Sequence, residues 1–151
     1  MFDFDGYTIY AFGGACSHDI DEGVFDAGKY PDEEAAKKEL KIWKRSRVFF
    51  RIKDLTWWAR ECAPTEEEIV RGWENLEKHG NKVNMILTHC LPQSVAAAIS
   101  YGIYKPNRVT KYLQMVAETV QFDDWYCGHY HENRNVMGKF HIRYENIERI
   151  F

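Results

Sequence analysis

Two apolar runs in the second half of the chain end in histidine-containing segments. The run over residues 83–87 continues into THCLP, and DWYC at residues 124–127 continues into GHYH. Short apolar runs with polar ends are typical of buried strands. The pattern therefore predicts two buried strands, one ending at His89 and the other followed by His129 and His131.

Helical spacing and capping signals predict the helices. Thr65 stands three residues before Glu68, as in a capping box, and apolar positions then recur at helical spacing until Gly80. Further helices are predicted from Pro31 to about residue 45 and over residues 109–120. Short β-branched or aromatic runs predict other strands, over residues 8–12, 48–52 (or an extended insertion), 139–144 and 146–151. This order indicates an α/β fold with its chemistry at the strand ends.

Composition limits the class of protein. The chain has 151 residues, is 45% hydrophobic and 28% charged, and carries a net charge of −3. We therefore expect a single globular domain over residues 1–151, and nothing in the charge pattern indicates nucleic acid as the main partner. No apolar run approaches the length of about 18 residues that a membrane helix requires. The acidic N-terminus and four scattered cysteines favour a cytoplasmic protein with reduced thiols.

The histidine pattern is the strongest chemical signal. Residues two apart in an extended segment point the same way, so His129 and His131 are expected to face one site, with Tyr130 pointing elsewhere. Gly128 before them allows close approach of the backbone. Neutral imidazoles bind zinc, manganese or iron. The sequence predicts a metal site built from His89, His129 and His131, whereas the remaining histidines are expected in surface or loop roles: His18, His79 and His141.

These motifs resemble those of the calcineurin-like metallophosphoesterases. LTHCLP and WYCGHYH are similar to the last two signature motifs of that family, and FGGACSHD is similar to a glycine-rich turn of one bacterial and phage branch. LTWWARECAPTEEEIVRGWENLEKH resembles the Trp-Trp and Glu-rich helix that precedes the THxxP-type motif in the same branch. The resemblance spans about Tyr7 to Arg143 and keeps the order of the family's motifs.

The resemblance implies a fold, a reaction and metal ligands. The fold would be part of a metallophosphoesterase-type β-sandwich flanked by helices. His89 and His129 would bind one divalent cation (Mn, Fe or Zn) and His131 a second. The reaction would be hydrolysis of a phosphate ester by metal-bound hydroxide, because two cations lower the pKa of water and neutralise charge on the phosphoryl oxygens.

The family's upstream motifs are missing. Asp-x-His, Gly-Asp-x-x-Asp and Gly-Asn-His-Asp/Glu precede the glycine-rich turn in the family, and no match to them occurs here. We therefore expect a domain incomplete at its N-terminus, with exposed apolar surface, at most one weakly bound metal and little activity alone. Three neutral imidazoles are a poor site for two dications without carboxylates. Besides the phosphate-ester substrate, a separate chain carrying the missing half is a candidate partner, and the catalytic residues are unknown.

Other functions are weighed against this one. A cysteine phosphatase is excluded because Ala96 stands where an Arg six residues after Cys90 would hold phosphate. A structural zinc site would use both cysteines and both histidines of the two motifs: Cys90, Cys127, His129 and His131. A non-catalytic interaction module would use Trp57 and Trp58 as an aromatic patch. Weaker candidates for substrate contact follow the motifs: Asp19, Asn133 and Arg134, although a loop salt bridge explains the last two more simply.

Overall fold

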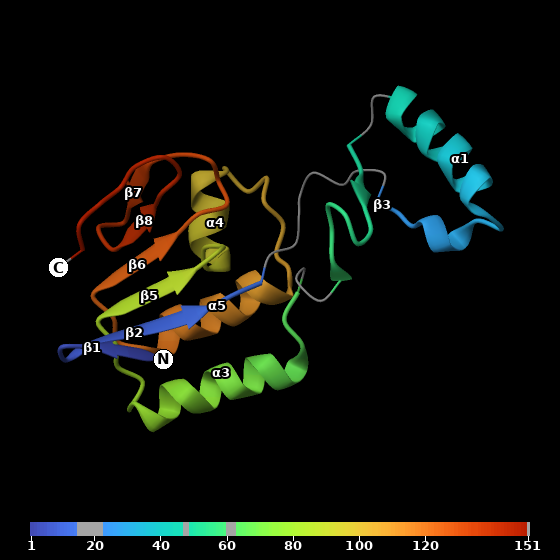
Figure 1. Ribbon diagram of the computed structural model, residues 1–151. Coiled ribbons are helices and arrows are strands. Elements are labelled where there is room, and N and C mark those ends of the chain that lie inside the picture. Colours follow the sequence, from blue (N-terminus) through green and yellow to red (C-terminus); the bar gives the residue numbers. More distant parts are fainter. Residues whose placement is uncertain (15–22, 47–48, 60–62, 151) are drawn as a thin grey trace. The chain divides into compact units, whose positions relative to one another are not determined.

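The computed structural model describes residues 1–14, 23–46, 49–59 and 63–150. The chain divides into two compact units, one made of Met1–Ala15 with Pro64–Phe151 and the other of Cys16–Ala63. Both histidine motifs lie in the first unit, which is coloured blue and then green to red in Figure 1. The expectation of one partial domain over residues 1–151 stays a prediction.

A six-stranded sheet forms the centre of the first unit. Its strands, in spatial order, are β1 (Phe2–Phe4), β2 (Tyr7–Phe12), β5 (Met85–Thr88), β6 (Asp124–Cys127), β8 (Phe140–Ile142) and β7 (Arg134–Val136). The strands β2, β5, β6 and β8 run parallel, while β1 and β7 are antiparallel to their neighbours at the two edges. The predicted α/β class is thereby confirmed as a mixed α/β fold.

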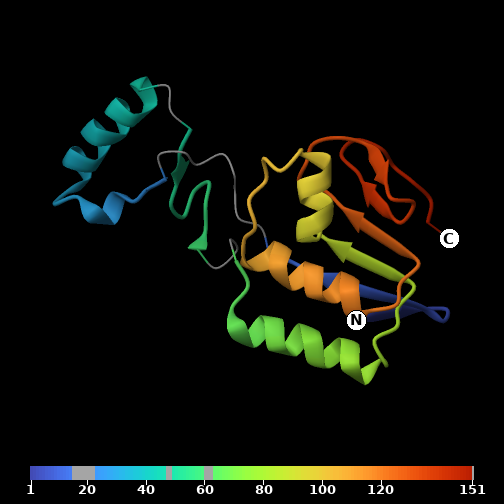
Figure 2. The same ribbon diagram turned by 180° about the vertical axis from the view of Figure 1, so that it is seen from behind.

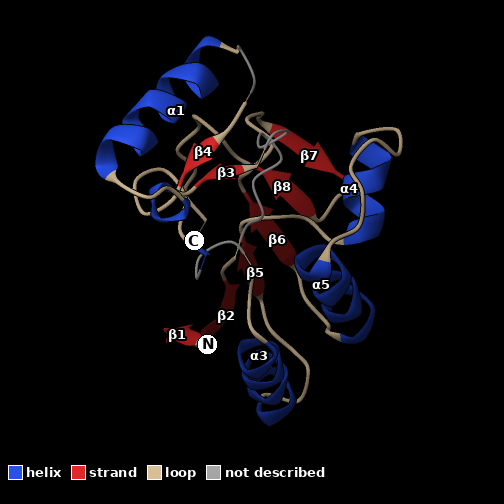
Figure 3. Ribbon diagram, turned by 90° about the vertical axis from the view of Figure 1, so that its right-hand side faces the viewer, coloured by secondary structure: helices blue, strands red, loops and turns tan. Residues whose placement is uncertain are grey.

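Three described helices pack on one face of this sheet: α3 (Glu66–Lys78), α4 (Gln93–Ile99) and α5 (Arg108–Thr119). Figures 2 and 3 show them on the same side. The predicted capping box is present, because Thr65 accepts a hydrogen bond from the Glu68 backbone and Glu68 accepts one from the Thr65 backbone. Asn107 caps α5 in the same reciprocal way. Local sequence thus fixes where the two longer helices begin.

The core lies between these helices and the sheet. The side chains of Ile86, Trp125 and Ile142 point from the strands toward Leu113 and Val116 of α5, and all five are 0% exposed. Burial of this apolar surface is the main source of stability for the unit.

The opposite face of the sheet carries a different row of side chains. Cross-strand partners point to the same face, so Ala11, Leu87, Tyr126 and His141 form one row on this side. Ala11 is exposed and the other three are half-buried. Within the described part of this unit, no helix covers this face (Figure 3).

The second unit is smaller. It contains the parallel pair β3 (Val24–Phe25) and β4 (Arg51–Ile52), a 3₁₀ turn at Ala27–Lys29, and α1 (Glu33–Arg45). Asp32 caps α1 by accepting a hydrogen bond from the Ala35 backbone, so the helix predicted from Pro31 begins at Glu33. The predicted strand over residues 48–52 is found as Arg51–Ile52, and Val48 lies outside the described residues.

Some local predictions were wrong or incomplete. Residues 146–150 form no strand; instead, side chains of the preceding segment hold this stretch. The helix α4 was not predicted because it is only 7 residues long and lacks a side-chain cap. Among the described helices, none combines the length and the apolar character needed to cross a lipid bilayer.

Candidate functional site

The two histidine motifs meet at the carboxyl ends of neighbouring strands. Thr88, the last residue of β5, pairs with Cys127, the last residue of β6, so the loops that follow leave the sheet side by side. His89 Nε2 lies 2.9 Å from His129 Nδ1, and their ring centroids are 4.7 Å apart. The predicted pairing of these histidines, 40 residues apart in the chain, is found in the structure.

Three hydrogen bonds hold the loops in place. The Thr88 hydroxyl donates to the Cys90 carbonyl oxygen at 2.6 Å and accepts from Trp125 Nε1 at 2.7 Å. The Leu91 backbone N–H donates to the Tyr130 hydroxyl at 3.1 Å, which joins one histidine loop to the other. Burial raises the pKa of Tyr130, so its hydroxyl stays neutral at physiological pH. The half-buried side chains of Thr88 and Tyr130 therefore connect the two loops that carry the imidazoles.

Sequence reasoning did not assign these supporting residues. Thr88 was expected only as a polar strand tip, and Tyr130 only as a side chain that points away from the histidines. Tyr130 instead stays beside one of them: its ring lies 5.0 Å from the His129 ring and 5.4 Å from the Tyr104 ring, and it packs against the core. The tyrosine between the two histidines could have indicated this role. A tyrosine next to an apolar strand can bury its ring in the core and use its hydroxyl group in a hydrogen bond.

His131 is placed differently from the prediction. The strand ends at Cys127, and both His129 (φ 68°) and His131 (φ 51°) have left-handed backbone conformations. The argument that two residues of an extended segment share one face was therefore wrong here. The His131 ring stacks on Tyr144 at 4.8 Å. Left-handed conformations at non-glycine residues cost of order 1 kcal/mol each and cluster at functional sites.

Gly128 does not have the expected role. Its φ is not left-handed, and a Cβ at this position would meet only the Arg143 carbonyl oxygen, at an ordinary 3.8 Å. The tight turn of the loop is made by the two histidines and not by the glycine.

The remaining histidines divide into three cases. His141, expected at the surface or in a loop, is half-buried in β8: its Nε2 lies 2.6 Å from Asp124 Oδ1, its Nδ1 lies 3.1 Å from Asn135 Oδ1, and its ring stacks on Tyr126 at 4.5 Å. That expectation was wrong because Asp124, Asn135 and Tyr126 of neighbouring strands cover part of its ring. His79 is exposed at the end of α3, as predicted. His18 lies outside the described residues, as does Asp19.

Both described cysteines next to the site belong to the core. Cys90 is 2% exposed and Cys127 is 5% exposed. Burial raises the pKa of Cys127 to about 12, which favours the thiol over the thiolate that zinc binds. Both cysteines are therefore small core residues in this structure.

The histidine pair has a spacing that suits a metal ion. Adjacent ligands about 2.1 Å from an octahedral cation are about 3.0 Å apart, close to the 2.9 Å between His89 Nε2 and His129 Nδ1. Within the described ranges, no group of three or more His, Cys, Asp or Glu side chains has the arrangement of a metal site. The imidazoles of His89 and His129 have the spacing of two adjacent ligands of one cation. A complete site would need further ligands from other groups.

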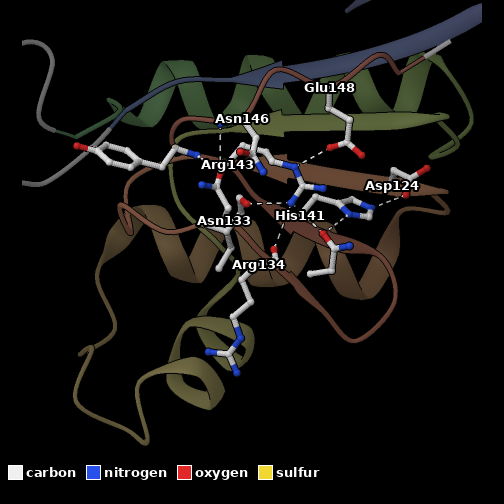
Figure 4. A network of polar contacts seen from close by, with 10 residues as sticks. Asp124, Asn133, Arg134, His141, Arg143, Asn146 and Glu148 are labelled. Atoms are coloured by element: carbon white, nitrogen blue, oxygen red, sulfur yellow. Dashed lines mark hydrogen bonds and ion pairs between the residues drawn. The ribbon is translucent and has the colours of Figure 1, made fainter.

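A polar pocket lies near the same edge of the sheet. It has a volume of about 340 Å³ and is lined mainly by Asn133, Asn135, Arg143 and Glu148. Arg143 donates to Glu148 at 2.6 Å and to Asn135 Oδ1 at 2.8 Å, while Asn133 Oδ1 accepts from the Tyr144 backbone (Figure 4). Most of these groups are used within the network, and the Arg134 side chain points away from it in Figure 4.

Comparison with known proteins gave no match, whether the chain was compared with protein-family models, curated proteins or solved structures.

Proposed function

We propose that the first unit is the C-terminal portion of a calcineurin-like metallophosphoesterase domain. The observation that carries the proposal is the contact between His89 and His129, 2.9 Å apart at the ends of two neighbouring parallel strands. In open α/β sheets, ligands bind outside the carboxyl ends of the strands. The resemblance of LTHCLP and WYCGHYH to the family's motifs assigns these imidazoles to a divalent cation.

His89 and His129 would bind one cation, of manganese, iron or zinc, and His131 would bind a second. His89 and His131 are exposed and His129 is half-buried, so the imidazoles are accessible to an ion from solvent. When bound, the cations supply a hydroxide nucleophile and neutralise charge on the phosphoryl group. The chain itself positions the ligands: Thr88 and Tyr130 fix the two loops before any ion binds.

The face of the sheet that no described helix of this unit covers supports the β-sandwich as the complete fold. Parallel sheets are normally covered on both faces, and here the row from Ala11 to His141 has no described helix over it. At the edge strand β1, Phe2 and Phe4 are 56% and 58% exposed. We propose that a second layer, which carries the family's upstream motifs, covers this face and contributes the carboxylates that the pair of cations requires.

Metal titration tests the site directly. Calorimetry with Mn²⁺, Co²⁺ and Zn²⁺ is expected to give at most one weakly bound ion per chain. His89→Ala and His129→Ala should each weaken binding by at least about tenfold, since each removes one of two adjacent ligands. His79→Ala is the matched control, because His79 is also exposed but lies at the end of α3. Equal binding by all four proteins would contradict the proposal.

Activity is tested with bis(p-nitrophenyl) phosphate and manganese. The chain alone should show little turnover. Adding a polypeptide that carries the Asp-x-His, Gly-Asp-x-x-Asp and Gly-Asn-His-Glu motifs should produce activity that His129→Ala removes. Robust turnover by the 151-residue chain alone would show that the metal site is complete without a partner.

A further inference from the structure

An apolar groove runs between α3 and α5. It has a volume of about 350 Å³. Its walls and floor are formed by Ile69, Val70 and Trp73 of α3 and by Tyr112 and Met115 of α5. All of these residues belong to the first unit, in which α3 and α5 lie side by side (Figure 2).

The packing beneath α3 fixes the floor of the groove. The Tyr112 hydroxyl lies 2.8 Å from the Tyr10 hydroxyl, and Gly72 sits directly above both. A Cβ at Gly72 would come within 2.7 Å of the Tyr10 hydroxyl and 2.8 Å of the Tyr112 hydroxyl. The absence of a side chain at this position therefore lets α3 settle on the two tyrosines. Arg108 of α5 forms an ion pair with Glu66 of α3, which ties the first turns of the two helices together.

The groove exposes large apolar side chains under an acidic rim. Val70 is 48% exposed and Met115 is 54% exposed. The charged lining residues are Glu74 and Glu77, and no Lys, Arg or His is among them. Trp73 Nε1 donates to Glu77 Oε1 at 2.9 Å, which holds that carboxylate at the rim. A ligand for this surface has to bring apolar side chains together with positive charge.

We propose that the groove binds a basic amphipathic helix of another protein. Lys or Arg side chains on the rims of such a helix would lie next to Glu74 and Glu77, while its apolar stripe would fill the space between Trp73 and Met115. An extended peptide fits less well, because the lining offers few polar atoms to pair with its backbone N–H and C=O groups. A helix satisfies those groups internally. The interaction is independent of the proposed metal site.

A synthetic peptide provides the probe. It has about five helical turns, with Leu at i, i+3 and i+7 positions and Lys on the flanking positions, and carries a fluorophore for anisotropy. The full chain is expected to bind it with a Kd on the order of 10 μM at low salt. A peptide with every Lys replaced by Glu should bind at least about tenfold more weakly.

Variants at exposed positions locate the binding site. Val70→Asp combined with Met115→Asp should abolish binding, whereas Ile103→Asp, at a position that is 75% exposed and outside the groove, should leave it unchanged. Glu74→Lys should weaken binding of the basic peptide by about fivefold or more, and Glu67→Lys on the same helix should not. Circular dichroism checks that each variant is folded.

Three outcomes would overturn the proposal. The first is equal affinity for the basic and acidic peptides, and the second is unchanged binding by the Val70→Asp, Met115→Asp variant. The third is a concentration-dependent dimer, seen by sedimentation, that this double variant dissociates, because the occupant would then be a second copy of the chain. The proposal is supported if the chain binds the basic peptide but not the acidic one, and if the Val70→Asp, Met115→Asp variant does not bind the basic peptide.

Discussion

The two faces of the six-stranded sheet differ although they are built from adjacent residues of the same strands. On the helix face, Tyr10, Ile86 and Trp125 are at most 2% exposed. One residue further along each strand, Ala11, Leu87 and Tyr126 point to the other face and are exposed or half-buried, although Ile9 and Met85 on that face are only 7% and 0% exposed. On the other face, the Arg143 guanidinium, directly after β8, lies over the Tyr126 ring at 5.7 Å, and His141 is held by Asp124 and Asn135. The helix face thus holds the main core, while the histidine pair lies at the carboxyl ends of the strands and on neither face.

The largest expected difference is between Trp125 and Tyr126. Trp125→Ala removes a side chain that is 0% exposed and donates a hydrogen bond to Thr88, and should lower the free energy of unfolding by about 3–5 kcal/mol. Tyr126→Ala removes a ring stacked on His141 and should cost about 1–2 kcal/mol. Urea denaturation measures both values. Equal losses would mean that the open face is packed as well as the helix face.

A substitution at Gly72 tests the packing of α3 on the helix face. Gly72→Ala would gain about 1 kcal/mol in helix propensity, but its Cβ would lie 2.7 Å from the Tyr10 hydroxyl and 2.8 Å from the Tyr112 hydroxyl. A net destabilisation of about 1–3 kcal/mol is expected. Replacing both tyrosines with Phe should make the same substitution less costly. Thermal unfolding of the four proteins gives the coupling, and its absence would contradict the close contact.

Cys127 separates the two kinds of metal site. Cys127→Ser places a hydroxyl in the core and should cost about 1–2 kcal/mol of stability. If the metal is bound by histidines, as proposed, the affinity for Zn²⁺ should change by less than about twofold. Loss of zinc binding in this variant would instead identify a structural site with thiolate ligands.

The smallest expected effect concerns the ion pair on the open face. The hydrogen bond from Arg143 lowers the pKa of Glu148 below its ordinary value of 4.5. The pair therefore stabilises the folded state at a pH above the pKa that Glu148 has in the unfolded chain. This stabilisation is lost as the pH falls through the lower pKa that Glu148 has in the folded chain. NMR signals of residues 144–150 should shift in this acidic range before those of the core. Arg143→Ala should move the transition to higher pH.

The sequence predicted a large part of the candidate site. The apolar runs ending at Thr88 and Cys127 gave two strands whose tips bring His89 and His129 together, because side chains at the ends of adjacent parallel strands are neighbours. The capping box at Thr65 fixed the start of α3, since its hydrogen bonds involve only residues three apart. Alternation in residues 139–144 indicated β8 correctly.

Other features depended on contacts between distant residues. The left-handed conformations of His129 and His131 turn the loop after β6 and place His131 against Tyr144, which no local pattern of HYH encodes. His141 is partly buried because Asp124, 17 residues earlier, lies beside it in the sheet. Tyr112, which lines the groove between α3 and α5, is held by the hydroxyl of Tyr10, 102 residues away in the chain. Local sequence determined the strands, the caps and the residues at the strand tips, since those depend on neighbouring side chains. The tertiary structure decided which face of the sheet is covered and where each histidine ring points, because both depend on which distant segments pack together.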